Sequence, residues 1–373
     1  MELIVKVTPT SSRASLSRLL TVPLGLDVWE VKADHVVLQA DEPQVDRLRQ
    51  MGYDIEPLYE TAPFVTRFAT ARAIDAYHSA QTLEQDLRQL AERHAEIAEL
   101  HEIGRSIEDR PIWALRLGEG RSSTRKLLFM GCHHAREWIA VEVPYLLAHY
   151  LLEESGRPPV QDWLSQGEIW VAPMVNLDGH EYSCTTNRLW RKNRRRNPDG
   201  SFGVDPNRNY GYMWGTLDIP TSSQTPSDAT YVGPRAFSEP ETRAIRDLLG
   251  RERFRGVITY HSYSQLILYP WGFTEEPMFA EDVDKAVRLA DRMQELMQDV
   301  HGKFYTPQPS AALYPTAGDT TDWTYGIYGI PSYTIELRPP TAEEGGFMLP
   351  PEQIQPTFEE YLPAALAFSE EVL

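Results

Sequence analysis

The segment GCHHAREW at 131–138 places His134 three residues before Glu137, directly after a short apolar run. At this spacing an imidazole and a carboxylate can converge on one metal ion. Catalytic zinc sites commonly use two histidines and one glutamate, and they leave the fourth position to water. Chance pairs of this kind are common on solvated surfaces, but a place at the carboxyl end of an apolar strand, where sheet crevices bind ligands, favours a metal site. His133 has the wrong spacing to Glu137 and is interpreted as a neighbouring polar side chain.

A third ligand is expected at another strand end, and His261 directly follows the apolar run expected to form a strand at 256–260. The chain has 10 histidines, so the ordinary interpretation of any one of them is a hydrogen-bonded core residue. The strand-end position that His261 shares with His134 favours the ligand interpretation instead.

Helices and buried strands alternate from Tyr77 onward, and these elements must position the candidate ligands. Strands are expected at 126–131, 168–175, 256–260, 265–269 and 332–337. Helices are expected from a Thr82–Gln85 capping box to about Leu100, and at 137–154, 238–249, 281–300 and 358–372. This alternation predicts an α/β fold in which a mixed, mostly parallel twisted sheet carries helices on both faces.

Residues 1–60 are expected to form a separate small α+β domain. Short strands are expected at 27–31 and 36–39, followed by a helix that stops at Gly52 and by another strand. Residues 61–75 are interpreted as a linker, which leaves 76–373 as the main domain.

Composition limits the possible partners. The chain has 373 residues, and 36 Lys and Arg against 54 Asp and Glu give a formal net charge of -18, which argues against a nucleic-acid partner. No apolar run reaches the length of a membrane span, so no membrane partner is expected. No secretory leader is visible, so the sequence as written predicts a cytoplasmic protein, or a secreted one if a leader has been removed. Cys132 and Cys184 are too few for a disulfide framework, and a monomer is expected.

Six segments follow one another in the order found in zinc carboxypeptidases of the pancreatic A/B type. They are GCHHAREW, NLDGHEYSCTTNRLWRKNRR, GVDPNRNYG, YHSYSQLILYPWG, DTTDWTYG and YTIELRP. The chain resembles this family over about residues 75–373. The resemblance implies a metallocarboxypeptidase that binds one zinc ion per chain through His134, Glu137 and His261. It also implies hydrolysis of the last peptide bond of peptides with a free C-terminus.

The resemblance assigns further residues around the metal. Asp205 is similar to the carboxylate that accepts a ring N–H from the first ligand histidine, although it can equally be a turn residue before Pro206. Glu336 matches the family's catalytic glutamate, which takes a proton from water and returns it to the leaving amine. The alternative for Glu336 is a salt bridge with Arg338, which its position on a buried strand disfavours. Arg191 resembles the arginine that polarises the scissile carbonyl.

The resemblance also implies residues that bind the substrate. Asn207 and Arg208 resemble the clamp for a C-terminal carboxylate, which a guanidinium can bind through two parallel hydrogen bonds. Tyr314 looks like the mobile tyrosine that closes over the bound residue. A neighbouring subsite is expected to use Arg136, Ser262 and Tyr263.

In this family, the floor of the specificity pocket lies a few residues before the Asp-Trp of the DTTDW segment. A carboxylate there selects Lys or Arg, and an aliphatic side chain selects aromatic and branched residues. This chain has Thr321 at that position, with Thr316 beside it, an open wall at Gly272, and Asp319 two residues away. A neutral floor gives a buried ammonium no counter-charge unless Asp319 reaches it. We therefore expect broad specificity that favours large neutral residues and accepts Lys and Arg through Asp319.

Two other functions stay open at this point. A protein that keeps the fold but only binds peptide C-termini is disfavoured, because each catalytic position carries the residue type that catalysis needs. A peptidase that acts on a non-peptide or cell-wall amide is compatible with the clamp. Residues 1–60 resemble, less closely, the short N-terminal regions ahead of some bacterial carboxypeptidases, and they are interpreted as a fold-assisting or inhibitory pro-segment or as a passive appendage.

Overall fold

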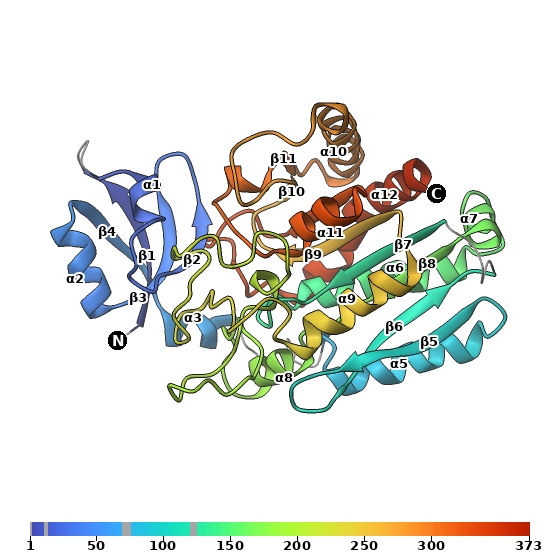
Figure 1. Ribbon diagram of the computed structural model, residues 1–373, viewed down its shortest axis with the longest axis horizontal. Coiled ribbons are helices and arrows are strands. Elements are labelled where there is room, and N and C mark those ends of the chain that lie inside the picture. The colour runs from blue at the N-terminus through green and yellow to red at the C-terminus, as the bar shows by residue number, and fades with distance from the viewer. Residues whose placement is uncertain (1, 11–13, 69–75, 120–124) are drawn as a thin grey trace.

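Two sheets divide the chain into a small N-terminal unit and a larger body (Figure 1). The computed structural model describes residues 2–10, 14–68, 76–119 and 125–373. The N-terminal unit holds a four-stranded sheet, and the body holds an eight-stranded sheet. Each unit buries a cluster of hydrophobic side chains of its own.

The sheet of the body runs in the order β11-β10-β12-β9-β7-β8-β6-β5. Its strands are β5 (Ala98–Arg105), β6 (Pro111–Leu117), β7 (Lys126–Gly131), β8 (Glu168–Ala172), β9 (Gly256–Ser262), β10 (Leu266–Tyr269), β11 (Thr306–Pro309) and β12 (Ser332–Leu337). The strands are parallel from β12 through β9 and β7 to β8, and in the pair β10–β11. Antiparallel pairs join β10 to β12, β6 to β8 and β5 to β6. The predicted α/β fold with a mixed, mostly parallel sheet is confirmed.

Helices flank this sheet as the sequence predicts (Figure 1). The helices of the body are α5 (Ala80–Arg93), α6 (Ile139–Glu153), α7 (Val160–Gln166), α8 (Leu177–Thr185), α9 (Pro240–Glu252), α10 (Ala280–His301), α11 (Thr320–Tyr328) and α12 (Ile354–Val372). Helix α6 packs against β7, β8 and β9, whereas α11 packs against β9 and β12. These two helices therefore contact the strands whose ends carry the candidate ligands.

The central strands are apolar because helices and neighbouring strands cover them on all sides. β7, β8 and β9 are buried over their whole length. A parallel strand with both faces covered needs apolar residues at nearly every position, which accounts for the runs KLLFMG, EIWVA and GVITY. Polar side chains begin where β7 and β9 reach the carboxyl edge of the sheet. Chemistry can therefore take place only at that edge of the central strands.

The N-terminal unit is an antiparallel sheet in the order β2-β3-β1-β4 with two short helices. Its elements are β1 (Glu2–Pro9), α1 (Leu16–Leu19), β2 (Asp27–Val31), β3 (Val36–Asp41), α2 (Glu42–Gln50) and β4 (Tyr53–Glu60). Val5, Leu38 and Leu48 are fully buried in the core of this unit. The predicted small α+β unit is confirmed, and β1 is an additional strand that the prediction did not include.

The predicted linker differs from the structure in its first half. Thr61–Phe68 form helix α3, and residues 69–75 lie outside the described residues. Phe64 is buried, and its ring centroid lies 6.2 Å from that of Trp29 and 4.9 Å from that of Tyr59. These contacts with the N-terminal sheet stabilise a helix of a length that is marginal without tertiary packing.

The predicted helix from Thr82 is wrong at both ends. Helix α5 begins two residues earlier, because Ser79 is its N-cap: Ser79 Oγ accepts the Thr82 N–H at 3.2 Å, and Thr82 Oγ1 accepts the Ser79 N–H at 2.9 Å. The last residue of α5 is Arg93, and the segment around Leu100 belongs to β5 instead. Pairing of β5 with β6 overrides the local helical pattern there.

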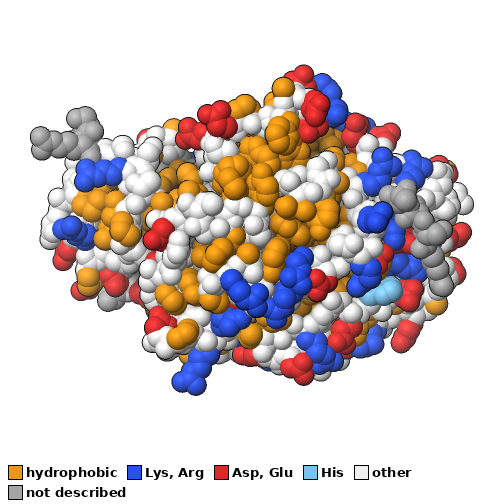
Figure 2. All heavy atoms as spheres, in the orientation of Figure 1, with side chains coloured by type: hydrophobic (Ala, Val, Ile, Leu, Met, Phe, Trp, Pro, Cys, Tyr) orange, Lys and Arg blue, Asp and Glu red, His pale blue; other side chains and the backbone are white. Residues whose placement is uncertain are grey.

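Exposed hydrophobic side chains gather near α10 and α11. Phe279, Ile327 and Tyr328 are exposed by 66%, 57% and 38%. Figure 2 shows hydrophobic side chains over the region where α10 and α11 lie in Figure 1. Helix α11 therefore presents apolar side chains to solvent at its C-terminal end, while its first turn is buried. In the described parts of the chain, no helix combines the length and the hydropathy needed to cross a bilayer.

Candidate metal and catalytic site

The three predicted metal ligands come together at the carboxyl edge of the sheet. His134 lies in the turn after β7, Glu137 lies just before α6, and His261 lies in β9. Glu137 Oε1 is 2.8 Å from His134 Nδ1, Glu137 Oε2 is 3.0 Å from His261 Nδ1, and the two Nδ1 atoms are 3.1 Å apart. All three residues are buried, and their ligand atoms lie within 4.8 Å of one another.

This set of donor atoms fits zinc. Two imidazole nitrogens and one carboxylate oxygen are the donors of many catalytic zinc sites, which keep a further position for water or substrate. Burial alone would raise the pKa of Glu137, but His134 and His261 lower it below its ordinary value. Glu137 is therefore ionised and available as a ligand.

The backbone after β7 sets this geometry. β7 and β9 are parallel neighbours with Gly131 opposite Tyr260, so both strands end at the same edge. A Cβ atom at Gly131 would lie 1.9 Å from the carbonyl oxygen of Ala140, so only glycine lets α6 approach the strand here. The next residue, Cys132, has a φ of 57°, in the left-handed region. This local conformation begins the turn that brings His134 to the edge.

Asp205 holds His134 on the side away from the other ligands. Its Oδ1 lies 3.2 Å from His134 Nε2, and its Oδ2 accepts hydrogen bonds from Arg191 Nε at 2.9 Å and Nη2 at 2.7 Å. Burial would raise the pKa of Asp205, but Arg191 and His134 lower it well below its ordinary range. The ionised carboxylate orients the ring so that Nδ1 faces the ligand group. Asp205 also accepts the Asn207 N–H at 2.9 Å, so it is a turn residue as well.

His133 lies outside the ligand group. It is fully buried, with Nε2 2.8 Å from the hydroxyl of Tyr210 and Nδ1 3.2 Å from Oγ1 of Thr259. Burial lowers the pKa of His133 well below its ordinary value, so the ring is neutral. It is a hydrogen-bonded polar side chain beside the ligand group.

Glu336 lies directly beside His261, because β12 and β9 are parallel and these two residues are opposite each other. Glu336 also lines the same cavity as His134 and His261. Arg338, the alternative partner of Glu336, donates hydrogen bonds to Glu360 through Nε at 2.8 Å and through Nη2. Glu336 is thus placed beside the ligand group, and Arg338 is held by a different carboxylate.

The surroundings of Glu336 favour its protonated form when no cation is near. Burial and the negative charge of Glu137 raise the pKa of Glu336 well above its ordinary value, while Arg191 and Arg208 act in the opposite direction. A divalent cation among the ligands adds positive charge and shifts this balance toward the carboxylate.

A cavity of about 40 Å³ at this edge gathers half of the predicted substrate-binding residues, two metal ligands and Glu336. This volume admits water but is far smaller than a typical ligand pocket of about 300–1,000 Å³. The predicted residues that line it are His134, Asn207, Arg208, His261, Tyr314, Thr316, Asp319 and Glu336. Further lining residues, which the sequence analysis missed, are Leu268, Ser310, Leu313 and Thr334.

Strand register could have revealed two of the missed residues. Thr334 precedes Glu336 by two positions on β12, so both side chains point to the same face of the sheet. Leu268 lies opposite Thr334 on the antiparallel neighbour β10. Thr321, the predicted floor, has its Oγ1 2.7 Å from Oγ1 of Thr334, and of these two threonines Thr334 lines the cavity.

Backbone contacts hold the predicted carboxylate clamp. Arg208 donates from Nε to the carbonyl of Thr221 at 2.6 Å and from Nη1 to the carbonyl of Asn207 at 2.7 Å. The Asn207 side chain accepts from the N–H of Thr320 at 2.9 Å and from its hydroxyl at 2.7 Å. Burial raises the pKa of Tyr314, which lines the same cavity, so its hydroxyl remains a hydrogen-bond donor.

Gly272 allows Thr316 and Asp319 to approach the cavity wall. A Cβ atom at Gly272 would lie 2.5 Å from Thr316 Oγ1 and 2.9 Å from Asp319 Oδ2. Asp319 Oδ2 accepts a hydrogen bond from Thr316 Oγ1 at 3.0 Å, and burial raises the pKa of Asp319. The missing side chain at Gly272 thus makes room for a carboxylate in the pocket.

The N-terminal unit covers the predicted neighbouring subsite. Arg136 is fully buried and donates to Asp27 of β2 from Nη1 at 2.5 Å and from Nη2 at 2.9 Å. Ser262 and Tyr263 are also buried, and the ring of Tyr263 packs against Phe347 with centroids 4.9 Å apart. The subsite expected from these residues is therefore closed in the intact chain.

Comparisons with known proteins agree with this geometry. Residues 83–364 match the zinc carboxypeptidase family. Carboxypeptidase B of Astacus astacus is 38% identical over 293 residues, which cover 76% of this chain and 93% of that protein. Carboxypeptidase O of Bos taurus is 34% identical over 341 residues, covering 86% of this chain and 87% of that protein.

Solved structures share the whole architecture. The crystal structure of carboxypeptidase A from Helicoverpa armigera has a TM-score of 0.86 and 25% identity, and the alignment covers 99% of this chain and 98% of that one. The crystal structure of thrombin activatable fibrinolysis inhibitor has a TM-score of 0.82 and 25% identity, covering 100% and 98%. Both alignments include the N-terminal unit. The chain is a metallocarboxypeptidase that belongs to the zinc carboxypeptidase family, of the pancreatic A/B type.

Proposed function

We propose that this chain removes single amino acids from the C-terminus of peptides at the site around His134, Glu137 and His261. The observation that carries the proposal is the position of Glu336, opposite His261 on the adjacent strand and on the wall of the cavity that Arg208 also lines. A metal-ligand group, a carboxylate and a guanidinium thus surround one small cavity. A metal-dependent exopeptidase can use these three groups to activate water, transfer its proton and bind a free C-terminus.

In the proposed mechanism His134, Glu137 and His261 would hold one zinc ion, which would supply polarisation of the scissile carbonyl and a lower pKa for water. Glu336 takes the proton of the attacking water and delivers it to the leaving amine. Asp205 occupies Nε and Nη2 of Arg191, which leaves Nη1 to donate to the oxygen of the scissile carbonyl.

Recognition of the free C-terminus is assigned to Asn207, Arg208 and Tyr314. The guanidinium of Arg208 faces the terminal carboxylate, with the Asn207 amide beside it. Because the cavity is far smaller than a typical ligand pocket and Tyr314 lines it, we assign to the Tyr314 ring a movement that admits the substrate and then closes over it.

A peptide and its C-terminal amide test this assignment. With zinc present, we expect release of the last residue from the free acid and at least about tenfold slower hydrolysis of the amide, since a charged clamp distinguishes the two by more than about 1.4 kcal/mol. Mass spectrometry of the shortened peptide provides the measurement. Equal rates for acid and amide, or cleavage of internal bonds, would contradict an exopeptidase that binds a terminal carboxylate.

The pocket supports broad specificity for the released residue. Leu268 and Leu313 supply apolar surface, and burying a large apolar side chain contributes about 1.5–3 kcal/mol. Thr316 and Thr334 are neutral, and Asp319 is the carboxylate of the pocket that a Lys or Arg side chain can approach through the space beside Gly272. We therefore assign a preference for large neutral residues, with basic residues accepted through Asp319.

Asp319→Asn is expected to weaken hydrolysis of peptides ending in Lys or Arg selectively. Loss of a buried carboxylate partner costs about 3–5 kcal/mol when the other charge stays buried, so kcat/KM for basic ends should fall at least about 100-fold. Asparagine keeps the N-cap of α11, since Asp319 Oδ1 accepts the Asp322 N–H at 2.9 Å and an amide oxygen can do the same. Peptides ending in Phe or Leu serve as the control. A similar loss on both kinds of peptide would remove Asp319 from the specificity assignment.

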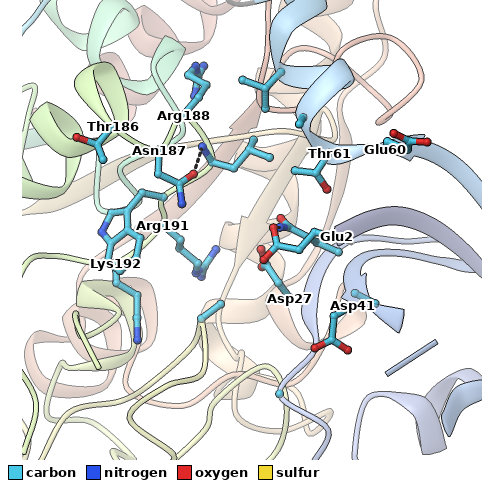
Figure 3. A pocket seen from close by; sticks show the side chains of 18 of the residues that line it. Glu2, Asp27, Asp41, Glu60, Thr61, Thr186, Asn187, Arg188, Arg191 and Lys192 are labelled. Carbon is cyan, nitrogen blue, oxygen red and sulfur yellow. Dashed lines mark hydrogen bonds between the residues drawn. The ribbon is translucent and has the colours of Figure 1, made fainter. Parts of the chain in front are cut away.

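The N-terminal unit is proposed to be an inhibitory pro-segment formed by residues 1–60 and separable from the catalytic domain at 76–373. Its Asp27 holds Arg136 of the predicted subsite. A cavity of about 980 Å³ separates the two units beside this contact. Figure 3 shows Glu2, Asp27 and Asp41 on the N-terminal side, and Arg188, Arg191 and Lys192 on the other. The cavity leaves part of the interface unpacked, which is typical of units that can separate.

Limited proteolysis within the predicted linker at 61–75 is expected to release the N-terminal unit. Because Arg136, Ser262 and Tyr263 then become accessible, kcat/KM for peptides of five or more residues should rise at least about tenfold, or about 1.4 kcal/mol. The control is a blocked dipeptide, which does not reach this subsite and should gain less. A cut chain that loses its thermal transition, or that gains nothing on long peptides, would favour a structural role for the unit.

A further inference from the structure

Two buried carboxylates lie at the side of the pocket that would receive a basic side chain. Asp319 is the N-cap of α11, and Asp322 lies in the first turn of the same helix. They are 6% and 0% exposed. A Cβ atom at Gly272 would lie 2.9 Å from Asp319 Oδ2 and 3.5 Å from Asp322 Oδ2, so both oxygens face the same point.

The hydrogen bonds of the two carboxylates differ. Asp322 accepts from the N–H of Gly272 at 2.9 Å and of Phe273 at 3.1 Å, which ties it to the backbone. Asp319 accepts the Asp322 N–H through Oδ1 and the Thr316 hydroxyl through Oδ2, and it lines the cavity. Asp319 is therefore the member of the pair that a ligand can reach.

This pair lacks a cation of its own. In the ranges that the structure describes, no Lys, Arg or His side chain lies within 4.0 Å of either carboxylate as an ion-pair partner. Arg208 acts on Asp319 from a greater distance. Burial raises the pKa of both residues, and the charge of Asp319 raises that of Asp322 further. Each negative charge makes ionisation of the other carboxyl less favourable, so the two groups titrate as a coupled pair and the proton that is retained is assigned to the pair.

We propose that the Asp319–Asp322 pair makes the choice between basic and neutral C-terminal residues depend on pH. This inference rests on the proposed function and concerns the regulation of the same pocket. A Lys or Arg side chain supplies the missing positive charge and displaces the shared proton to solvent, so binding of a basic residue releases one proton. A neutral side chain leaves the proton on the pair. Thr316 stabilises the ionised state, because its hydroxyl donates to Asp319 Oδ2 at 3.0 Å.

The consequence is a selectivity that rises with pH. Below the apparent pKa of the pair, binding of a basic end must release the proton, so its kcat/KM relative to that of a neutral end rises about tenfold per pH unit. Above that pKa the pair is already ionised and the ratio is constant. Substrate Lys and Arg side chains stay charged throughout, because their own pKa values are about 10.4 and above 12.

Titration of the other charged groups near the cavity does not change the ratio of kcat/KM between basic and neutral C-termini. Arg208, Glu336, His134 and His261 line the same cavity, and Arg191 lies close by. These groups contact the terminal carboxylate and the scissile bond of the substrate. Both of these parts are the same in basic and neutral substrates. Titration of these groups changes both rates by the same factor and cancels when the two substrates compete in one mixture. Any partial blocking of the site by the N-terminal unit cancels in the same way.

The experiment is competition between two short peptides that differ only in a C-terminal Arg or Leu, with the intact zinc-loaded chain, between about pH 5 and pH 8.5. We expect the Arg-to-Leu ratio of kcat/KM to rise about tenfold per pH unit at the acidic end and then to level off. Asp319→Asn should give a low Arg-to-Leu ratio that does not change with pH. Thr316→Val removes a hydrogen bond to the ionised form and should move the break to higher pH.

The outcomes separate the two proposals. A flat ratio in the unmodified chain, with both peptides hydrolysed, overturns the proton-linked choice and leaves the exopeptidase assignment intact. An unchanged slope in Asp319→Asn overturns the assignment to this pair. Failure to hydrolyse either peptide overturns the proposed function and this inference with it.

Discussion

Glu336→Gln is expected to lower kcat by about 10²–10⁴-fold, the range typical for loss of a general acid–base group. Glutamine has nearly the shape of glutamate but cannot take the proton of the attacking water. Glu336 is not one of the three metal ligands, so the zinc content should remain at one per chain. KM should change little, because the terminal carboxylate is held by other residues. Steady-state kinetics on a peptide ending in Leu provide the measurement.

The matched control is Glu344→Gln, an exposed position outside the cavity. It should leave kcat unchanged, and both variants should keep the thermal midpoint of the unmodified chain. If Glu336→Gln keeps nearly full kcat with zinc bound, Glu336 is structural and another base carries the reaction.

His134→Ala is expected to abolish both stoichiometric zinc binding and hydrolysis. It removes one of three protein donors and leaves Asp205 without the ring that it orients. The loss of activity should exceed that of Glu336→Gln, because without the metal neither the carbonyl nor the water is activated. Metal analysis by mass spectrometry, together with peptide hydrolysis, measures both effects.

The neighbouring His133 offers a matched control. It is a buried histidine one residue away, but its ring nitrogens contact hydroxyl groups and lie outside the ligand group. His133→Ala should reduce stability and keep one zinc ion per chain. If His133→Ala lost its zinc and His134→Ala retained it, His133 would be the ligand in place of His134.

The carboxyl edge of the sheet could be predicted because its strands leave little choice. β7 and β9 are mostly apolar runs, and β12 is buried along nearly its whole length, as expected at the centre of a covered sheet. Each run ends at or just before a residue with chemical function: His134, His261 and Glu336. Parallel strands end at one edge, so these three residues were expected to meet there, and the structure brings them together.

Features that depend on distant contacts could not be predicted from local patterns. Arg136 was expected to line a subsite, and its partner Asp27 lies 109 positions away in a different unit. Helix α3 depends on the packing of Phe64 against the N-terminal sheet. The local pattern predicts a helix to about Leu100, but pairing with β6 makes the residues from Ala98 onward part of β5.

The linear motif also did not predict which threonine lines the pocket wall. Thr321 was expected at the floor because of its position before Asp-Trp, yet its hydroxyl contacts Thr334, which lines the cavity from β12. A linear motif gives the order of residues on α11 but not the strand that packs against it. Side chains alternate between the two faces of β12, so Thr334 lies on the same face as Glu336. This alternation predicts that Thr334 lines the cavity.

Stepwise addition of zinc to the chelated chain tests the central claim most directly. The measured quantity is the rate of release of the C-terminal residue from a free-acid peptide at each zinc-to-chain ratio. One site made of His134, Glu137 and His261 predicts no activity without metal, a linear rise, and a break at about one equivalent. Hydrolysis of the same peptide by a chain shown to contain no metal would contradict the account.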